Sequence, residues 1–167
     1  MQTTTRGQFW PLDPKADEIR IEDIAHALSN ICRYGGHCRQ FYSVAEHSCH
    51  VSDHLPPDLA LAGLLDDAAE AYIGDMIRPI KYSMPEYQEI DDRISAIIRK
   101  KFGIQGERNA EVIRVDNAIL ADESEQAMGG QIYSWGLTEK PLNVRLKFWS
   151  PTIAGHEFMM RFETLYR

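Results

Sequence analysis

The sequence of 167 residues has few cysteines and no long apolar run. Its three cysteines, Cys32, Cys38 and Cys49, are too few for a disulfide framework and favour reduced thiols. No stretch approaches the roughly 18 apolar residues that a membrane-spanning helix needs. The opening residues, MQTTTRGQFWPLDP, lack the apolar segment of a secretory signal. We therefore expect a cytoplasmic protein without a membrane partner.

The chain also lacks an excess of basic residues. Its 18 Lys and Arg face 25 Asp and Glu, which gives a formal net charge of −7. Binding to a nucleic-acid polymer depends on basic side chains that replace counterions along the backbone, so this balance disfavours that class of partner. A small phosphorylated ligand stays possible, because a local cluster of basic groups or metal ions can hold one phosphate inside an acidic protein.

The apolar spacing predicts an all-α protein, and the chain length suits a single domain over residues 1–167. The first 20 residues, with Pro11 and Pro14, predict a short strand or hairpin and a loop. Ser43 with Glu46 has the form of a capping box that opens a helix. Gly- and Pro-containing stretches at 33–41, 76–85 and 128–148 predict loops. The helices are expected at 21–32, 43–54, 57–73, 85–102, 109–127 and 151–165.

The stretch GLLDDAAEAYIGD, residues 63–75, contains several carboxylates. They fall in a predicted helix at positions where the spacing of apolar residues indicates the buried face. Asp66, Asp67 and Glu70 stand at positions i, i+1 and i+4, so we expect Asp66 and Glu70 on one helical face with Asp67 beside them. Like charges at this spacing repel each other, and more so when buried. Something positive should therefore face them, and both a cation site and a solvated acidic face fit this pattern.

Two more side chains favour the cation site. His47 lies in the preceding helix, and the short Pro-Pro connection brings the two helices back antiparallel. Asp116 lies beside the apolar stripe of VIRVDNAILADE. With Asp66 and Asp67 these side chains would make a mixed nitrogen and oxygen site suited to Mn²⁺, Co²⁺, Mg²⁺ or Zn²⁺. The alternative is that His47 and Asp116 are hydrogen-bonded core residues.

Four stretches together resemble one known family. ALSNICRYGGHCRQFYSVAEHS, GLLDDAAEAYIGDMIRPIK, VDNAILADE and the helix after WSP are similar to the small HD-domain phosphohydrolases, in the bacterial and prophage branch related to HD-type 5′-deoxynucleotidases. The resemblance implies an HD-domain helical bundle whose metal ligands are His47, the pair Asp66 and Asp67, and Asp116. Asp66 stands where the family has histidine. Three readings compete: a working site retuned toward Mn²⁺ or Mg²⁺, a weakened site, and a substitution introduced to trap a complex.

The resemblance also implies roles in catalysis. The metal would lower the pKa of bound water from about 15.7 toward about 7. Asp67 and Glu70 are the catalytic pair, with Glu70 protonating the leaving alkoxide. Asp75 matches the family position that contacts the sugar 3′ hydroxyl. From the sequence pattern alone, Asp75 is part of a Gly-Asp turn that ends a helix.

Phosphate needs cationic donors, and the resemblance assigns that role first to Arg33, whose planar fork suits a phosphate. Tyr34 matches an aromatic residue that packs on the sugar or base. Arg78 and Lys81 are further candidates for phosphate binding, with Lys81 preferred. His37 either hydrogen-bonds the phosphate or braces the glycine loop.

These inferences predict a metal-dependent hydrolase that removes the 5′-phosphate of deoxyribonucleoside monophosphates. A triphosphohydrolase acting on deoxynucleoside triphosphates is the nearest alternative. A protein that binds nucleotide without hydrolysing it, because of Asp66, is the alternative of another class. The resemblance further implies a homodimer or a larger homo-oligomer.

Overall fold

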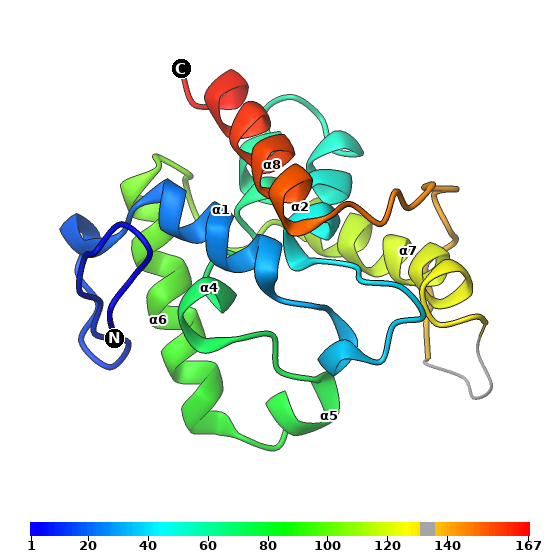
Figure 1. Ribbon diagram of the computed structural model, residues 1–167, viewed down its shortest axis with the longest axis horizontal. Coiled ribbons are helices and arrows are strands. Elements are labelled where there is room, and N and C mark those ends of the chain that lie inside the picture. The colour runs from blue at the N-terminus through cyan, green and yellow to red at the C-terminus, as the bar shows by residue number, and fades with distance from the viewer. Residues whose placement is uncertain (131–135) are drawn as a thin grey trace.

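Helices provide nearly all the regular structure of the chain. The computed structural model describes residues 1–130 and 136–167 (Figure 1). Its elements, in chain order, are η1 (Ala16–Glu18), α1 (Ile21–Asn30), η2 (Tyr34–Gly36), α2 (Val44–Asp53), α3 (Ala60–Leu64), α4 (Glu70–Ile73), α5 (Arg78–Lys81), α6 (Pro85–Lys101), α7 (Ala110–Gln126) and α8 (Pro151–Leu165). The predicted all-α class is confirmed.

Side-chain caps fix the starts of three of these helices. Ser43 accepts a hydrogen bond from the Glu46 amide at 3.1 Å, and Ser150 opens α8 in the same way. Asn109 accepts from the Glu111 amide at 2.8 Å at the start of α7. Each cap satisfies an amide that has no partner inside its helix. The predicted boundaries of α2, α6, α7 and α8 are therefore right to within a residue or two.

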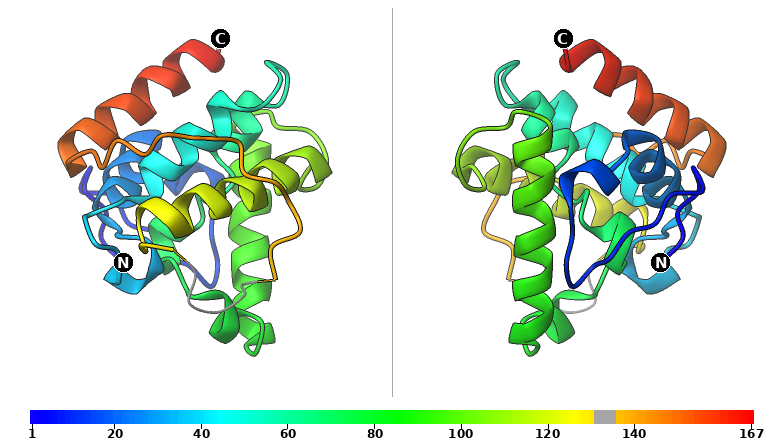
Figure 2. Two further views of the ribbon diagram at one scale, coloured as in Figure 1. Left: turned by 90° about the vertical axis from the view of Figure 1, so that its right-hand side faces the viewer. Right: turned by 90° about the vertical axis from the view of Figure 1, so that its left-hand side faces the viewer.

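The core has two parts. In the first, α8 lies across α1 and α2, and α4 packs against α1 from below (Figure 1). Buried residues such as Leu28, Val44 and Phe158 fill this layer. In the second, α7 packs against α2 through Val51, Val115 and their neighbours. Helix α6 also belongs to the first part, because Ile94 and Ile98 lie in the same cluster as Phe158 of α8, and Figure 2 shows α6 as the long upright helix. Helix α2 belongs to both parts and carries His47 between them.

The predicted helix at 57–73 is wrong, because the chain forms two short helices with a tight turn between them. Inside α3 the amide of Leu65 still bonds to the carbonyl of Leu61, four residues back. After Leu65 the backbone hydrogen bonds join residues only three apart: the Ala68 amide donates to the Leu65 carbonyl at 3.2 Å, and the Glu70 amide donates to the Asp67 carbonyl at 3.0 Å. Aspartate is a poor helix former, and adjacent aspartates repel each other. The turn therefore sends Asp66 and Asp67 toward different partners.

Three loop predictions need adjustment. The N-terminal hairpin is a turn closed by one antiparallel bridge between Gln2 and Gln8, without a named strand. The irregular stretch after Met76 contains the short helix α5. The predicted loop at 128–148 lies partly outside the described residues; its described parts have no regular secondary structure. No helix in the described ranges is both long and apolar enough to cross a membrane.

Candidate active site

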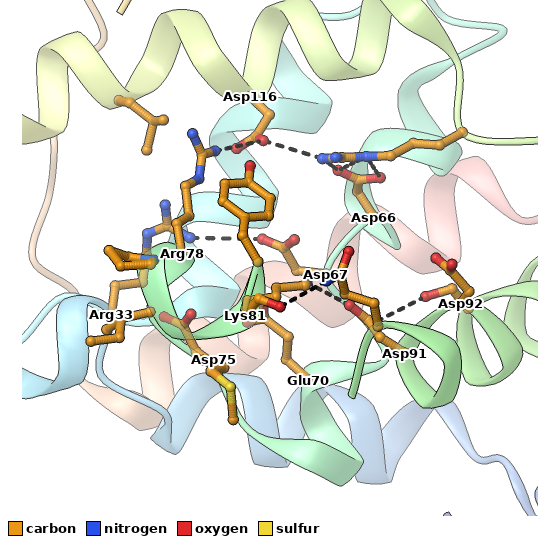
Figure 3. A pocket seen from close by; sticks show the side chains of 18 of the residues that line it. Arg33, Asp66, Asp67, Glu70, Asp75, Arg78, Lys81, Asp91, Asp92 and Asp116 are labelled. Carbon is orange, nitrogen blue, oxygen red and sulfur yellow. Dashed lines mark hydrogen bonds and ion pairs between the residues drawn. The ribbon is translucent and has the colours of Figure 1, made fainter. Parts of the chain in front are cut away.

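A cavity of about 1160 Å³ opens between α4, α5, α6 and the start of α7. Figure 3 shows its carboxylates and basic side chains pointing toward one another from these separate elements. Most of the predicted site residues line it: Arg33, Tyr34, Asp66, Asp67, Glu70, Asp75, Arg78, Lys81 and Asp116. The structure does not bring His37 to this cavity; the residue is exposed on the loop after η2.

His47 lies beneath the floor of the cavity with only 1% of its surface exposed. Its Nε2 atom is 3.2 Å from Asp116 Oδ1 and 3.5 Å from Asp67 Oδ2. These three side chains come from α2, the turn before α4, and α7. The antiparallel return of the chain after α2 thus brings together three of the four predicted metal ligands.

Glu123 holds the other side of His47, and the sequence analysis did not identify it. This carboxylate is fully buried and lies 2.6 Å from His47 Nδ1. It also accepts hydrogen bonds from Arg33 Nη2 at 3.0 Å, from Tyr42 at 2.8 Å and from Tyr34. The signal in the sequence was its position seven residues after Asp116, two helical turns along the same face of α7. Glu123 therefore orients the imidazole so that Nε2 faces the cavity.

The charges around His47 shift its titration. Burial and Arg33 lower the pKa of His47, but Glu123 and the hydrogen bond to Asp116 outweigh them and raise it to about 9. Burial opposes the charged form of Glu123, yet Arg33 and His47 lower the pKa of that carboxyl to about 2. In the metal-free protein, His47 is therefore protonated at neutral pH and forms a charged pair with Glu123.

This pair makes the stability of the metal-free protein depend on pH. The folded-state pKa of His47 is above its unfolded value, so the stabilisation is fully present below about pH 6.5 and is lost as pH rises through about 9. Between these limits we expect the free energy of unfolding to fall by up to about 3 kcal/mol more than in His47→Gln. Urea unfolding with EDTA measures the difference. Equal pH slopes in parent and variant would contradict the assignment.

Asp66 has a different partner from the other predicted ligands. Arg108 Nε donates to its two oxygens at 2.8 and 3.0 Å, and Arg108 Nη2 contacts it as well. The same Nη2 donates to Asp116 Oδ2 at 3.1 Å. Burial raises the pKa of Asp66 to about 6 against the lowering effect of Arg108. Arg108 is the positive group that the crowded carboxylates required, although the sequence did not indicate which residue would supply it.

Arg33 stands at the inner end of the cavity. Its Nη1 atom is 3.7 Å from Asp67 Oδ2, while its Nε atom is buried without a protein partner. Tyr34 lies beside it, with the Arg33 guanidinium 5.3 Å from the centre of the ring. A positive φ of 57° at Tyr34 is unusual for a residue with a side chain and belongs to the tight turn of η2. Arg33 thus lines the cavity and has an N–H donor, on Nε, that no protein group accepts.

The two other predicted cations are paired. Arg78 donates to Asn117 Oδ1 at 3.2 Å and to Asp116 Oδ2 at 3.4 Å, with its side chain half exposed. Lys81 forms an ion pair with Asp91 Oδ2 at 2.5 Å. Lys81 thus shares its charge with Asp91 but keeps further N–H donors, and Arg78 is the more exposed of the two.

Glu70 is the buried acid of the cavity. Its Oε2 atom has no protein partner, and the residue is 9% exposed. Burial raises its pKa well above the usual range, and Asp67 and Asp75 add to the effect. Burial also raises the pKa of Asp75, with Asp67 adding to it. Burial and the neighbouring carboxylates thus favour the protonated form of the Glu70 carboxyl, which lines the cavity.

The chemistry of the donors fits a divalent cation. His47 can offer Nε2 to a cation once that nitrogen loses its proton, while Glu123 holds Nδ1, which is the second contact that metal-binding histidines use. Asp67 and Asp116 offer the oxygens that hard cations prefer. Within residues 1–130 and 136–167, however, no three His, Cys, Asp or Glu side chains already form an arrangement that could hold a metal ion. Arg108 and Arg78 instead contact Asp116.

Glu46 departs from its predicted role. In a capping box its carboxylate would return to the start of its own helix. Instead the fully buried carboxylate accepts backbone hydrogen bonds from Lys147, Phe148 and Trp149, at 2.7, 2.9 and 2.6 Å. Glu46 therefore anchors the segment before α8, and it supports the site only by holding α2 in place.

Comparison with known proteins finds two relatives that match most of the chain. The chain is 36% identical over 152 residues to the uncharacterized protein YfdR of Escherichia coli strain K12, covering 89% of this chain and 85% of that protein. It is 38% identical over 132 residues to an uncharacterized protein of Rhodobacter capsulatus, covering 71% of this chain and 67% of that one. No family model matches the chain. The chain belongs to the same family as YfdR.

Proposed function

We propose that this protein is an HD-domain, metal-dependent phosphohydrolase that removes the 5′-phosphate of deoxyribonucleoside monophosphates. The observation that carries the proposal is that Arg33, the buried carboxyl of Glu70 and the trio His47, Asp67 and Asp116 meet at one cavity. A hydrogen-bond donor to the phosphate, a proton donor and a set of cation ligands are the three parts that hydrolysis of a phosphate ester requires. The sequence resemblance adds the HD assignment and a homo-oligomer, and the few cysteines add a cytoplasmic location.

The chain's own residues supply most of the mechanism. His47, Asp67 and Asp116 would hold a divalent cation. When bound, that cation supplies a water molecule of lowered pKa and screens the negative charge of the phosphate. Arg33 donates hydrogen bonds to the phosphate oxygens. Glu70 gives its proton to the 5′ oxygen as that oxygen leaves phosphorus, and the raised pKa of its buried carboxyl favours the protonated form that this role needs.

Asp75 and the basic residues at the mouth orient the rest of the ligand. Asp75 lines the cavity with Glu70 (Figure 3), and it is the proposed contact for the sugar hydroxyl. Arg78 and Lys81 also line the cavity. Arg33 is the donor proposed for the phosphate that is cleaved, because the resemblance assigns that role to it and its buried Nε atom has no protein partner.

Product analysis tests the substrate. The protein is incubated with Mn²⁺ and either deoxyribonucleoside monophosphates or deoxynucleoside triphosphates, and the products are separated by anion-exchange chromatography. We expect inorganic phosphate and nucleoside from the monophosphates. Release of intact triphosphate would instead assign the triphosphohydrolase activity. Nucleotide binding without any product would assign a non-hydrolysing protein.

A further inference from the structure

Arg108 joins two carboxylates that the sequence placed in one metal site. Its guanidinium binds Asp66 through both Nε and Nη2, and Nη2 continues to Asp116 Oδ2 at 3.1 Å. Both Asp66 oxygens are therefore engaged. Figure 3 shows Asp66 and Asp116 facing each other across this contact, with Asp67 to one side.

The position of Arg108 matters for any cation in the site. Asp116 uses Oδ1 toward His47 at 3.2 Å and Oδ2 toward Arg108. A divalent cation on Asp116 would then stand within a few ångströms of a fixed positive charge. At such distances a single and a double positive charge repel each other. The Arg108 side chain is 43% exposed, so solvent screens part of this repulsion.

We propose that Asp66 is the anchor of Arg108 and not a metal ligand, and that Arg108 is a built-in counter-ion which weakens divalent-cation binding at His47, Asp67 and Asp116. The inference rests on the metal site of the proposed function. It gives the aspartate at position 66 a role of its own: with a histidine there, Arg108 would lose its bidentate carboxylate partner.

The first test measures Mn²⁺ binding by isothermal titration calorimetry with the metal alone. In Arg108→Gln the positive charge is gone, and we expect the dissociation constant to fall at least about tenfold. Arg114→Gln is the matched control: Arg114 has the same 43% side-chain exposure, lies six residues further along the chain, and forms its ion pair in the described structure with Glu111, outside the site. We expect its effect to stay within about twofold. Unchanged or weaker Mn²⁺ binding in Arg108→Gln overturns the proposal.

The second test separates anchor from ligand. The double variant Asp66→Asn/Arg108→Gln removes one negative and one positive charge, so the net charge of the site stays the same. If Asp66 is an anchor, this variant binds Mn²⁺ at least as tightly as the parent. If Asp66 is a ligand, binding weakens by about tenfold or more, and the proposal fails. The double variant removes both partners of the ion pair, so neither charge is left unpaired. It therefore decides the question even if Arg108→Gln does not fold. Thermal unfolding of each variant shows whether it is folded.

Phosphate release from the parent in excess Mn²⁺ keeps this inference distinct from the proposed function. Tighter Mn²⁺ binding by Arg108→Gln, with no hydrolysis by either protein, would overturn the proposed function and support the role of Arg108. Hydrolysis by the parent, with Mn²⁺ affinity unchanged in Arg108→Gln, would support the function and overturn the role of Arg108.

Discussion

Replacing Glu70 with glutamine should lower kcat for phosphate release by about 10²- to 10⁴-fold, the usual contribution of a positioned acid. The amide keeps the size of the side chain but has no acidic proton for the leaving oxygen. The pKa of the Glu70 carboxyl is raised well above its ordinary value by burial and by Asp67 and Asp75, which favours the protonated form that can donate to the leaving oxygen. Steady-state kinetics with a deoxyribonucleoside monophosphate measures the effect.

The kinetic loss should come without a loss of binding. Mn²⁺ affinity measured by calorimetry should stay close to that of the parent, because Glu70 is not among the three proposed ligands. Glu89→Gln, an exposed glutamate on α6 outside the cavity, is the control for the substitution itself. A Glu70→Gln variant as active as Glu89→Gln would show that another group protonates the leaving oxygen.

Replacing Glu123 with glutamine should destabilise the fold by about 3–5 kcal/mol, the usual result of removing one partner of a buried ion pair. Glu123 is fully buried and is the shared carboxylate of Arg33 and His47, at 3.0 and 2.6 Å. Glutamine has the same shape but removes the buried carboxylate that both cations share, and leaves them only the more distant Asp67 and Asp116. Urea unfolding monitored by circular dichroism gives the change in free energy.

Two residues further along α7, Glu125 provides the matched control. Its side chain is exposed, so Glu125→Gln should change stability by no more than about 0.5 kcal/mol. A similar, small effect of both substitutions would mean that the network around Glu123 does not hold the site together. The metal-free protein is the right sample, because a bound cation would stabilise the folded state by mass action.

The long helices could be predicted because their signals are local. Asn109 and Ser150 cap their helices through amides two or three residues away, and the apolar faces of α6 and α7 repeat within each helix. The break after Leu65 could not be predicted in this way. The apolar rhythm of 57–73 continues through Asp66 and Asp67, and only their partners in the folded chain explain the turn.

The site was predictable in part for the same reason. The residues of GLLDDAAEAYIGD and the single candidates His47 and Asp116 stood out as polar groups in apolar surroundings. Arg108 and Glu123 did not, because their roles come from contacts across the fold: Arg108 meets Asp66 across 42 residues of sequence, and Glu123 meets His47 across 76. Nothing near Arg108 in the chain marks it as different from other surface arginines.

One measurement tests the central proposal most directly: release of inorganic phosphate from deoxyribonucleoside monophosphates by the purified protein, with Mn²⁺ and with EDTA. The joint position of Arg33, Glu70 and the trio His47, Asp67 and Asp116 predicts phosphate release that requires the metal and is lost in Asp67→Asn. Release that is equal with Mn²⁺ and with EDTA, or no release from any nucleotide at saturating Mn²⁺, would contradict a metal-dependent phosphohydrolase.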